Sequence, residues 1–161
     1  MAANNITRLL DSKKVPHKAF ELSDEKRGAI ETARLLGVEP DLVYKTIVVT
    51  RQLGKPILAV IPGPNRVNLK LLAAALGEKK LSLSTEREAE HLTGLQAGGI
   101  SPLALIHKGF QVVVDVAAQE KTEIHVSGGQ RSLNVRLPVK ALVELTRARF
   151  ARISNPEDES F

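Results

Sequence analysis

The chain has no cysteine and no tryptophan, and aromatic residues make up only 3% of its 161 residues. Without cysteine the sequence offers no disulfide, no thiol nucleophile and no thiolate ligand for a metal. With so few aromatic side chains, the hydrophobic core has to be built from leucine, valine, isoleucine and alanine. The composition therefore excludes catalysis by a cysteine of this chain and fits a reducing compartment.

Long hydrophobic runs are also missing. No apolar stretch approaches the roughly 20 residues that span a bilayer, and residues 1–8 contain no hydrophobic signal segment. We therefore expect no membrane association and a cytoplasmic location. The four histidines lack the spacing of a metal site or a catalytic triad. We expect no metal and no cofactor, and we interpret as structural or exposed His17, His91, His107 and His125.

The length and the charge of the chain limit its organisation and its partners. A chain of 161 residues fits one domain. Its formal net charge of +5 and its pI near 9.6 favour an anionic partner such as RNA. No repeat, linker or low-complexity block divides the sequence. We predict a single domain over residues 1–161, with a core at about 5–153 and a frayed polar tail at 154–161.

Helices are predicted where apolar residues recur at helical spacing between capping residues and glycine or proline stops. They comprise a first helix capped by Asn5 and ended before Pro16, residues 29–36 closed by Gly37, residues 69–76 capped by Asn68 and closed by Gly77, residues 85–92 capped by Ser84, and a last helix opened by Pro138 whose buried face includes Leu142, Leu145 and Phe150.

Strands are predicted between these helices, at residues 17–22, 47–49, 57–61, 79–83, 111–115, 123–126 and 133–137. Residues 47–49 and 57–61 should form a hairpin around Gly54. Both runs are apolar on successive residues, which indicates a sheet covered on both faces. The predicted fold class is a compact α+β domain with a mixed or largely antiparallel central sheet of about six or more strands, flanked by helices.

Three short segments carry most of the functional information: VYKTIVV at 43–49, GGISP at 98–102 and VSGGQR at 126–131. A glycine pair lets backbone N–H groups face a ligand without interference from Cβ atoms, and a lysine adds a positive charge. We read both glycine pairs as turns. Together the three segments predict a pocket for an electron-rich group.

With Asp115 and the AAQE that follows at 117–120, these segments resemble, in order and spacing, the YbaK and ProX family of aminoacyl-tRNA deacylases, which also occurs as the editing insertion of some prolyl-tRNA synthetases. The resemblance covers about residues 5–153 and is strongest to the YbaK branch. It implies a compact α+β domain with a pocket on one side. It also implies aminoacyl-tRNA as a largely sequence-independent partner, with prolyl-tRNA synthetase as a further partner.

Cleavage of an aminoacyl ester needs a nucleophile, donors for the developing oxyanion and a fixed substrate pose. Ser101 and Ser127 lie in suitable segments, but neither has a histidine or carboxylate beside it in sequence, and a serine without a base is a poor nucleophile. The resemblance implies instead that the thiol of the substrate's cysteine attacks its own ester, closes a thiolactone and releases the tRNA. The predicted catalytic residues are Lys45, Gly99 and Ser127, with backbone N–H groups of Gly99 or its neighbours receiving the oxyanion.

The predicted substrate-binding residues share these segments or lie where the resemblance places a pocket wall: Phe20, Tyr44, Thr46, Gly98, Ile100, Ser101, Gly128, Gly129, Arg131 and Asn134. Structural alternatives stay open for several residues. Lys45 could be a solvated strand edge, the glycine pairs could form only tight turns, Ser127 could be a turn-forming hydroxyl, Phe20 could belong to the core, and Arg131 could be simply exposed. We interpret Asp115 and Glu120 as orienting turns, and the helix at 85–92 as a solvated face.

Asn134 departs from the family pattern, which usually has aspartate here. Asparagine keeps the hydrogen-bonding shape but loses the negative charge that would hold a substrate ammonium. Gln130, where lysine is common, removes one phosphate-binding charge. The resemblance to the YbaK branch implies a trans-editing deacylase for Cys-tRNA(Pro), or also Cys-tRNA(Cys). The alternatives are a ProX-like hydrolase of Ala-tRNA(Pro) and a non-catalytic module that binds tRNA or the aminoacyl group.

Overall fold

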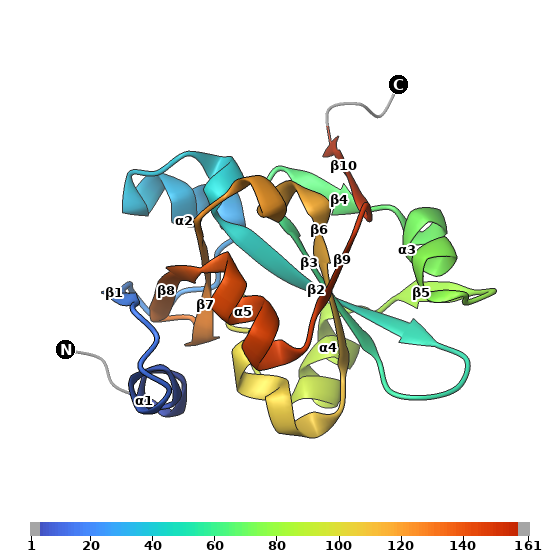
Figure 1. Cartoon of the computed structure of the whole chain (residues 1–161), viewed down its shortest axis with the longest axis horizontal. Coiled ribbons are helices and arrows are strands. Elements are labelled where there is room, and N and C mark those ends of the chain that lie inside the picture. The colour runs from blue at the N-terminus through green and yellow to red at the C-terminus, as the bar shows by residue number, and fades with distance from the viewer. Residues whose placement is uncertain (1–3, 158–161) are drawn as a thin grey trace.

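The strands form three sheets within residues 4–157, which the computed structural model describes (Figure 1). The largest has five strands in the order β5 (Leu81–Leu83), β2 (Tyr44–Arg51), β3 (Ile57–Pro62), β6 (Gln111–Asp115) and β9 (Arg149–Ala151). A second has the order β1 (Lys18–Glu21), β8 (Leu133–Pro138) and β7 (Glu123–Gln130). The third pairs β10 (Ser154–Pro156) with β4 (Asn65–Val67).

The largest sheet is mixed, as the sequence predicts. Strand β2 is antiparallel to both β3 and β5, whereas β3, β6 and β9 run parallel. The α+β fold class is confirmed, but the main sheet has five strands rather than the predicted six or more, because β1, β7 and β8 form a separate sheet. The hairpin of β7 and β8 is not part of that sheet. Among the described residues, one isolated parallel bridge links its backbone to the start of β2, between Val43, which precedes the strand, and His125.

The helices lie around these sheets: α1 (Asn5–Ser12), α2 (Ala29–Leu36), α3 (Leu69–Leu76), α4 (Glu86–Thr93) and α5 (Val139–Thr146), with 3-10 turns η1 (Pro40–Leu42), η2 (Pro102–Lys108) and η3 (Val116–Glu120). The bounds predicted for α2 and α3 are confirmed. Gly37 and Gly77 close them in the left-handed conformation, with φ of 71° and 69°, which glycine adopts without steric cost.

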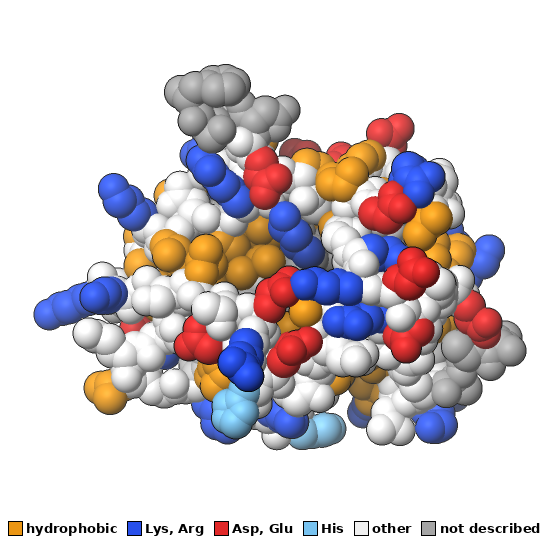
Figure 2. All heavy atoms as spheres, turned by 180° about the vertical axis from the view of Figure 1, so that it is seen from behind, with side chains coloured by type: hydrophobic (Ala, Val, Ile, Leu, Met, Phe, Trp, Pro, Cys, Tyr) orange, Lys and Arg blue, Asp and Glu red, His pale blue; other side chains and the backbone are white. Residues whose placement is uncertain are grey.

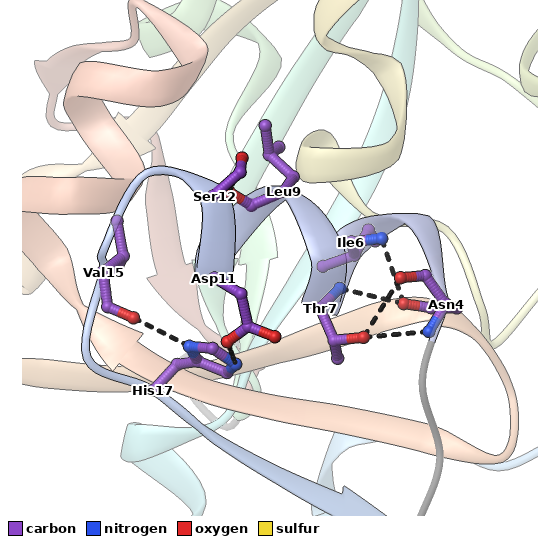
Figure 3. Close-up of polar contacts among 8 residues, drawn as sticks. All are labelled: Asn4, Ile6, Thr7, Leu9, Asp11, Ser12, Val15 and His17. Atoms are coloured by element: carbon purple, nitrogen blue, oxygen red, sulfur yellow. Dashed lines mark hydrogen bonds and ion pairs between the residues drawn. The ribbon is translucent and has the colours of Figure 1, made fainter.

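Two predicted caps are wrong by one residue. Helix α1 is capped by Asn4, whose Oδ1 accepts hydrogen bonds from the N–H groups of Ile6 and Thr7, while the Thr7 hydroxyl accepts from the Asn4 N–H (Figure 3). Helix α4 is capped by Thr85 instead of Ser84, and Glu88 completes the reciprocal pair. In both places a capping box decides the boundary, because it satisfies donors at two positions rather than one.

The core has two parts, one on each face of the largest sheet. Strand β3 is buried along its whole length, which confirms a sheet covered on both faces. On one face, Val48 and Val60 meet Val126 and Val135 of the three-stranded sheet and Leu142 of α5. The other face packs against α3. The first part of the core therefore holds the two sheets together, with β7 close to β2.

Several features near the C-terminus differ from the prediction. Phe150 lies in β9, not on the last helix, because Arg147 ends α5 in a left-handed conformation. Residues 154–157, predicted as frayed, pair with β4 through β10, and Glu157 N–H donates to Pro64 O. The remainder of the predicted tail, 158–161, lies outside the described residues. Among residues 4–157, no helix is both long and apolar enough to cross a membrane.

Candidate functional site

A cavity of about 340 Å³ opens along one edge of β2. Six consecutive residues, 43–48, line it, so the cavity meets the edge of the strand rather than one face. At one end of this stretch Val43 is bridged to His125, and at the other end Val49 pairs with Leu83 of β5. Between these two points the edge has no strand partner among the described residues. The gap between β7 and β5 is therefore the opening of the site.

Lys45 lies on this edge and is partly buried. No described residue forms a hydrogen bond or an ion pair with its ammonium group. Burial lowers the pKa of Lys45, while the charge of Glu157 acts in the opposite direction. A desolvated cation without a partner is costly unless a ligand supplies the opposite charge. The surroundings of Lys45 suit an electron-rich ligand group.

The first glycine pair packs directly against the segment that follows the second pair. A Cβ atom on Gly99 would lie 2.9 Å from the Gln130 Cα and 3.1 Å from the Arg131 N, so only glycine permits this approach. The N–H of Gly99 donates to Gln96 O at 2.8 Å. Gly98 and Ile100 both line the cavity, and within the described part of the chain neither N–H has a hydrogen-bond acceptor. In this turn, the N–H groups left open are therefore those of Gly98 and Ile100 rather than that of Gly99.

The second glycine pair is not a turn, which corrects the prediction. It lies inside β7, where the register with β8 shifts between Ser127 and Gln130. Ser127 lines the cavity, and its hydroxyl accepts a hydrogen bond from the Gly129 N–H at 3.2 Å. Among the described residues, no histidine or carboxylate forms a hydrogen bond with this hydroxyl. Gly128 and Gly129 do not line the cavity: Cβ atoms there would approach Leu133 and Ile6 at 2.6 and 2.9 Å.

Arg131 ties the two glycine segments together at the rim of the cavity. Its Nε donates to Ala97 O at 2.7 Å, and its own carbonyl accepts from Arg27 Nη1 at 2.9 Å. Arg27 also donates to the Ser23 hydroxyl at 2.7 Å. Both arginines line the cavity. Their positive charge therefore lies at the site, although some of their N–H groups already donate hydrogen bonds to backbone carbonyls.

Asn134 lines the cavity from β8 and is only 4% exposed. Its Oδ1 lies 2.9 Å from Nδ1 of His125, which is 2% exposed. Burial is the main cause that lowers the pKa of His125, which favours the neutral imidazole. Phe20 packs beside that ring with centroids 5.4 Å apart and is not itself a lining residue. Phe20 thus supports the wall from behind.

The remaining predicted residues divide between the cavity and the core. Tyr44 and Thr46 line the cavity, and Tyr44 is also part of the core between the sheets. Its buried hydroxyl has no partner among the described residues, and burial raises its pKa. Ser101 is fully buried, outside the cavity, and caps η2 by accepting from the Leu103 N–H at 3.2 Å.

Several lining residues were not predicted, including Arg27, Thr32, Ser84 and Glu86. Thr85, Glu86 and Ala89 bring one side of α4 to the cavity, so the helix at 85–92 is not only a solvated face. A Ser-Thr pair before a helix was the available signal, but it indicates a cap equally well. Asp115 orients backbone as predicted: it accepts from the Ala117 N–H and the Ser154 hydroxyl at 2.9 and 2.7 Å.

The described residues contain no cluster of three or more His, Cys, Asp or Glu side chains that could hold a metal ion. The charged and polar groups at the cavity include Lys45, two arginines and Glu86, with open backbone amides, the Ser127 hydroxyl and the Asn134 carboxamide. Such a set can grip and polarise an ester, but it lacks an activated protein nucleophile.

Comparisons with known proteins find relatives over most of the chain. Residues 24–145 match the family model of the aminoacyl-tRNA editing domain. A protein of Enterococcus faecalis, EbsC, named as a candidate Cys-tRNA(Pro)/Cys-tRNA(Cys) deacylase, is 35% identical over 155 residues, covering 95% of this chain and 94% of EbsC.

Solved structures also resemble the chain along almost its whole length. The hypothetical protein APE2540 matches with a TM-score of 0.86 and 26% identity, covering 94% of this chain and 100% of that one. A candidate trans-editing enzyme for prolyl-tRNA synthetase matches with a TM-score of 0.79 and 25% identity, covering 96% and 99% of the two chains. These matches confirm the resemblance inferred from the sequence.

Proposed function

This chain belongs to the aminoacyl-tRNA editing domain family, and from that premise we propose that it is a trans-editing deacylase. Its substrate is cysteine esterified to tRNA(Pro), with Cys-tRNA(Cys) as a further substrate. EbsC supports this choice, since its name refers to the same two esters and the similarity spans both chains. The cysteine thiol of the substrate supplies the nucleophile.

The observation that carries this proposal is the meeting of Lys45, the Gly98 turn and Ser127 at one cavity without a general base on the serine. The volume of about 340 Å³ lies in the lower part of the range of roughly 300–1,000 Å³ typical of small-ligand sites. A protein nucleophile would need an adjacent base or a lowered pKa. A substrate thiol needs only to be held close to the carbonyl carbon.

The reaction then follows from the placement of these groups. The substrate sulfur, as thiolate, attacks the ester carbonyl carbon, and the carbonyl oxygen takes up the negative charge. The N–H groups of Gly98 and Ile100 stabilise this oxyanion, and Lys45 lowers its energy through charge. As the carbonyl re-forms, the carbon–oxygen bond to the ribose breaks and the aminoacyl group leaves as a thiolactone. The ribose oxygen takes up a proton from solvent, which balances the proton that the thiol released to solvent on forming the thiolate. Ser127 holds the substrate by a hydrogen bond.

The tRNA is held mainly by charge and shape. The net charge of +5 favours an RNA partner, and Arg27 and Arg131 put positive charge at the rim of the cavity. Figure 2 shows basic and acidic side chains interspersed over one face, around exposed apolar surface. A face of mixed charge suits a few phosphate contacts near the aminoacylated end of the tRNA better than a long interface that recognises bases. Prolyl-tRNA synthetase is the partner that would deliver the mischarged tRNA.

The test is a deacylation panel on one tRNA(Pro) carrying cysteine, serine or alanine. Cysteine should be cleaved and serine, which is nearly the same size but far less nucleophilic, should survive. Equal rates for cysteine and serine would contradict the thiol mechanism. Preferential cleavage of alanine would favour the water-attack alternative, and no cleavage of any ester would favour a binding module.

A further inference from the structure

His125 and Asn134 lie on one face of the three-stranded sheet. The register pairs Ser127 with Asn134 and His125 with Arg136 directly across β7 and β8. His125 and Ser127 are two residues apart, so their side chains share a face, and Asn134 is the diagonal neighbour of His125. The alternate residues Val126 and Val135 point into the core. This face is therefore polar and is turned away from the core between the sheets.

In the structure the carboxamide oxygen of Asn134, and not its NH2 group, faces the imidazole of His125. The Nδ1 of His125 lies 2.9 Å from Oδ1 of Asn134, and an oxygen acceptor requires that Nδ1 carry the proton. Within residues 4–157 no group accepts a hydrogen bond from Nδ2 of Asn134. Since Asn134 lines the cavity, its NH2 group is the part left for a ligand.

We propose that His125 is a positioning residue, which holds the Asn134 carboxamide so that its NH2 group donates to an electron-rich acceptor of the aminoacyl group. The acceptor is either the ester oxygen that develops charge or the attacking sulfur. The proposal rests on the proposed function and adds a specificity element to it. In this arrangement Asn134 does not receive the substrate ammonium.

The surroundings of His125 support a fixed ring. Phe20 of β1 packs against it at a centroid distance of 5.4 Å and an interplanar angle of 47°. The charged groups that act on the ring are Arg136, which opposes its protonation, and Glu123, which favours it. These two form an ion pair with each other at 3.6 Å. The guanidinium of Arg136 lies 5.8 Å from the Phe20 ring centroid. Phe20, which packs against the imidazole of His125, is therefore itself held in place by Arg136.

The first arm of the test introduces a negative charge at position 134 and asks whether kcat/KM falls or rises. Asn134→Asp replaces the donor by an acceptor of the same shape, and we expect kcat/KM for Cys-tRNA(Pro) to fall about tenfold or more, as for a lost hydrogen bond to a charged group. Asn134→Ala should lower kcat/KM by a similar factor. If Asn134 instead receives the ammonium through its oxygen, Asn134→Asp will raise kcat/KM, and that result would overturn the proposal. An unchanged rate would overturn it as well.

The second arm separates positioning from packing. His125→Phe keeps a ring against Phe20 but removes the donor, whereas His125→Asn keeps an N–H near the position of Nδ1. We expect about tenfold loss of kcat/KM in the first variant and recovery of most of it in the second. In an Asn134→Ala background, His125→Phe should have little further effect. Equal losses in the Phe and Asn variants, or full additivity with Asn134→Ala, would contradict a positioning role.

The third arm needs neither a variant nor activity. Nitrogen NMR of the histidine ring in the wild-type protein reports which nitrogen carries the proton, and we expect the Nδ1–H tautomer at His125. The Nε2–H tautomer would overturn the proposal even if every variant failed to fold. If the wild-type protein cleaves no aminoacyl ester, the proposed function fails, while this measurement still decides the state of His125.

Discussion

The two glycine pairs of this chain share a dipeptide but occupy different surroundings. Gly98 is exposed on the cavity wall with an open N–H, whereas Gly128 and Gly129 are packed behind the wall against Leu133 and Ile6. Gly99 belongs with the second kind, because it packs on the backbone of Gln130. We call the region of Gly99, Gly128 and Gly129 the joint. We call the cavity-lining residues Lys45, Gly98 and Ser127 the wall. Our proposal places the substrate at the wall, whereas the joint holds the two glycine segments against each other.

The largest effect is expected at the joint. Gly99→Ala puts a Cβ 2.9 Å from the backbone of Gln130, and backbone cannot move aside as a flexible side chain can. We expect a loss of about 3 kcal/mol in the free energy of unfolding, the upper end for overpacking, together with loss of deacylation. Denaturant unfolding measures the first and a tRNA assay the second. A stable but inactive Gly99→Ala protein would place Gly99 in the wall instead.

Lys45 tests the wall. Lys45→Met keeps the apolar stem of the side chain and removes the charge, so we expect kcat/KM for Cys-tRNA(Pro) to fall about 100-fold, equivalent to about 2.7 kcal/mol. The unfolding free energy should stay within about 0.5 kcal/mol of wild type, since no described residue pairs with this ammonium. If Lys45→Met lowers the free energy of unfolding by more than the free-energy equivalent of its loss in kcat/KM, Lys45 has a structural role like that of the joint.

Gly128 offers a softer test of the joint. A Cβ there meets the Leu133 side chain at 2.6 Å, so we expect Gly128→Ala to cost about 2 kcal/mol of stability. Leu133→Ala removes the two nearest atoms, Cγ and Cδ2, and leaves only the Leu133 Cβ, at 3.0 Å. The double variant should therefore be more stable than the sum of the two single changes predicts. Strict additivity in unfolding experiments would show that contact with Leu133 is not the cause.

The smallest expected effect is a change of kcat/KM with pH that depends on Lys45. Because burial lowers the pKa of Lys45, its positive charge is lost at a lower pH than that of an exposed lysine. Raising the pH should therefore reduce its contribution to kcat/KM, by about twofold where half of the side chains are neutral. Lys45→Arg, which stays charged, is the reference. If both proteins respond alike above neutral pH, Lys45 does not act through its charge.

Much of the fold could be predicted because its signals are local. Helix α2 and strand β6 have their predicted bounds, since an apolar pattern is followed there by a stop or a buried turn. Strands β4, β9 and β10 have only three residues each and were missed. Each depends on pairing with a distant segment, and a three-residue run carries too little periodicity to show it.

The site could be predicted only in part for the same reason. The segments containing Lys45, Gly98 and Ser127 were identified, and the structure brings them to one cavity. The engagement of the Gly99 N–H with Gln96 and the contact of His125 with Asn134 depend on the path of the backbone and on strand register. A histidine isolated in sequence gives no signal of a partner nine positions away across a hairpin.

The central claim is that the substrate's sulfur cleaves its own ester. Rapid quenching of the reaction with Cys-tRNA(Pro), followed by mass spectrometry of the small products, tests it directly. The account predicts that cysteine thiolactone appears together with free tRNA and only later gives cysteine. Free cysteine formed from the first turnover, with no thiolactone at any time, would contradict the account.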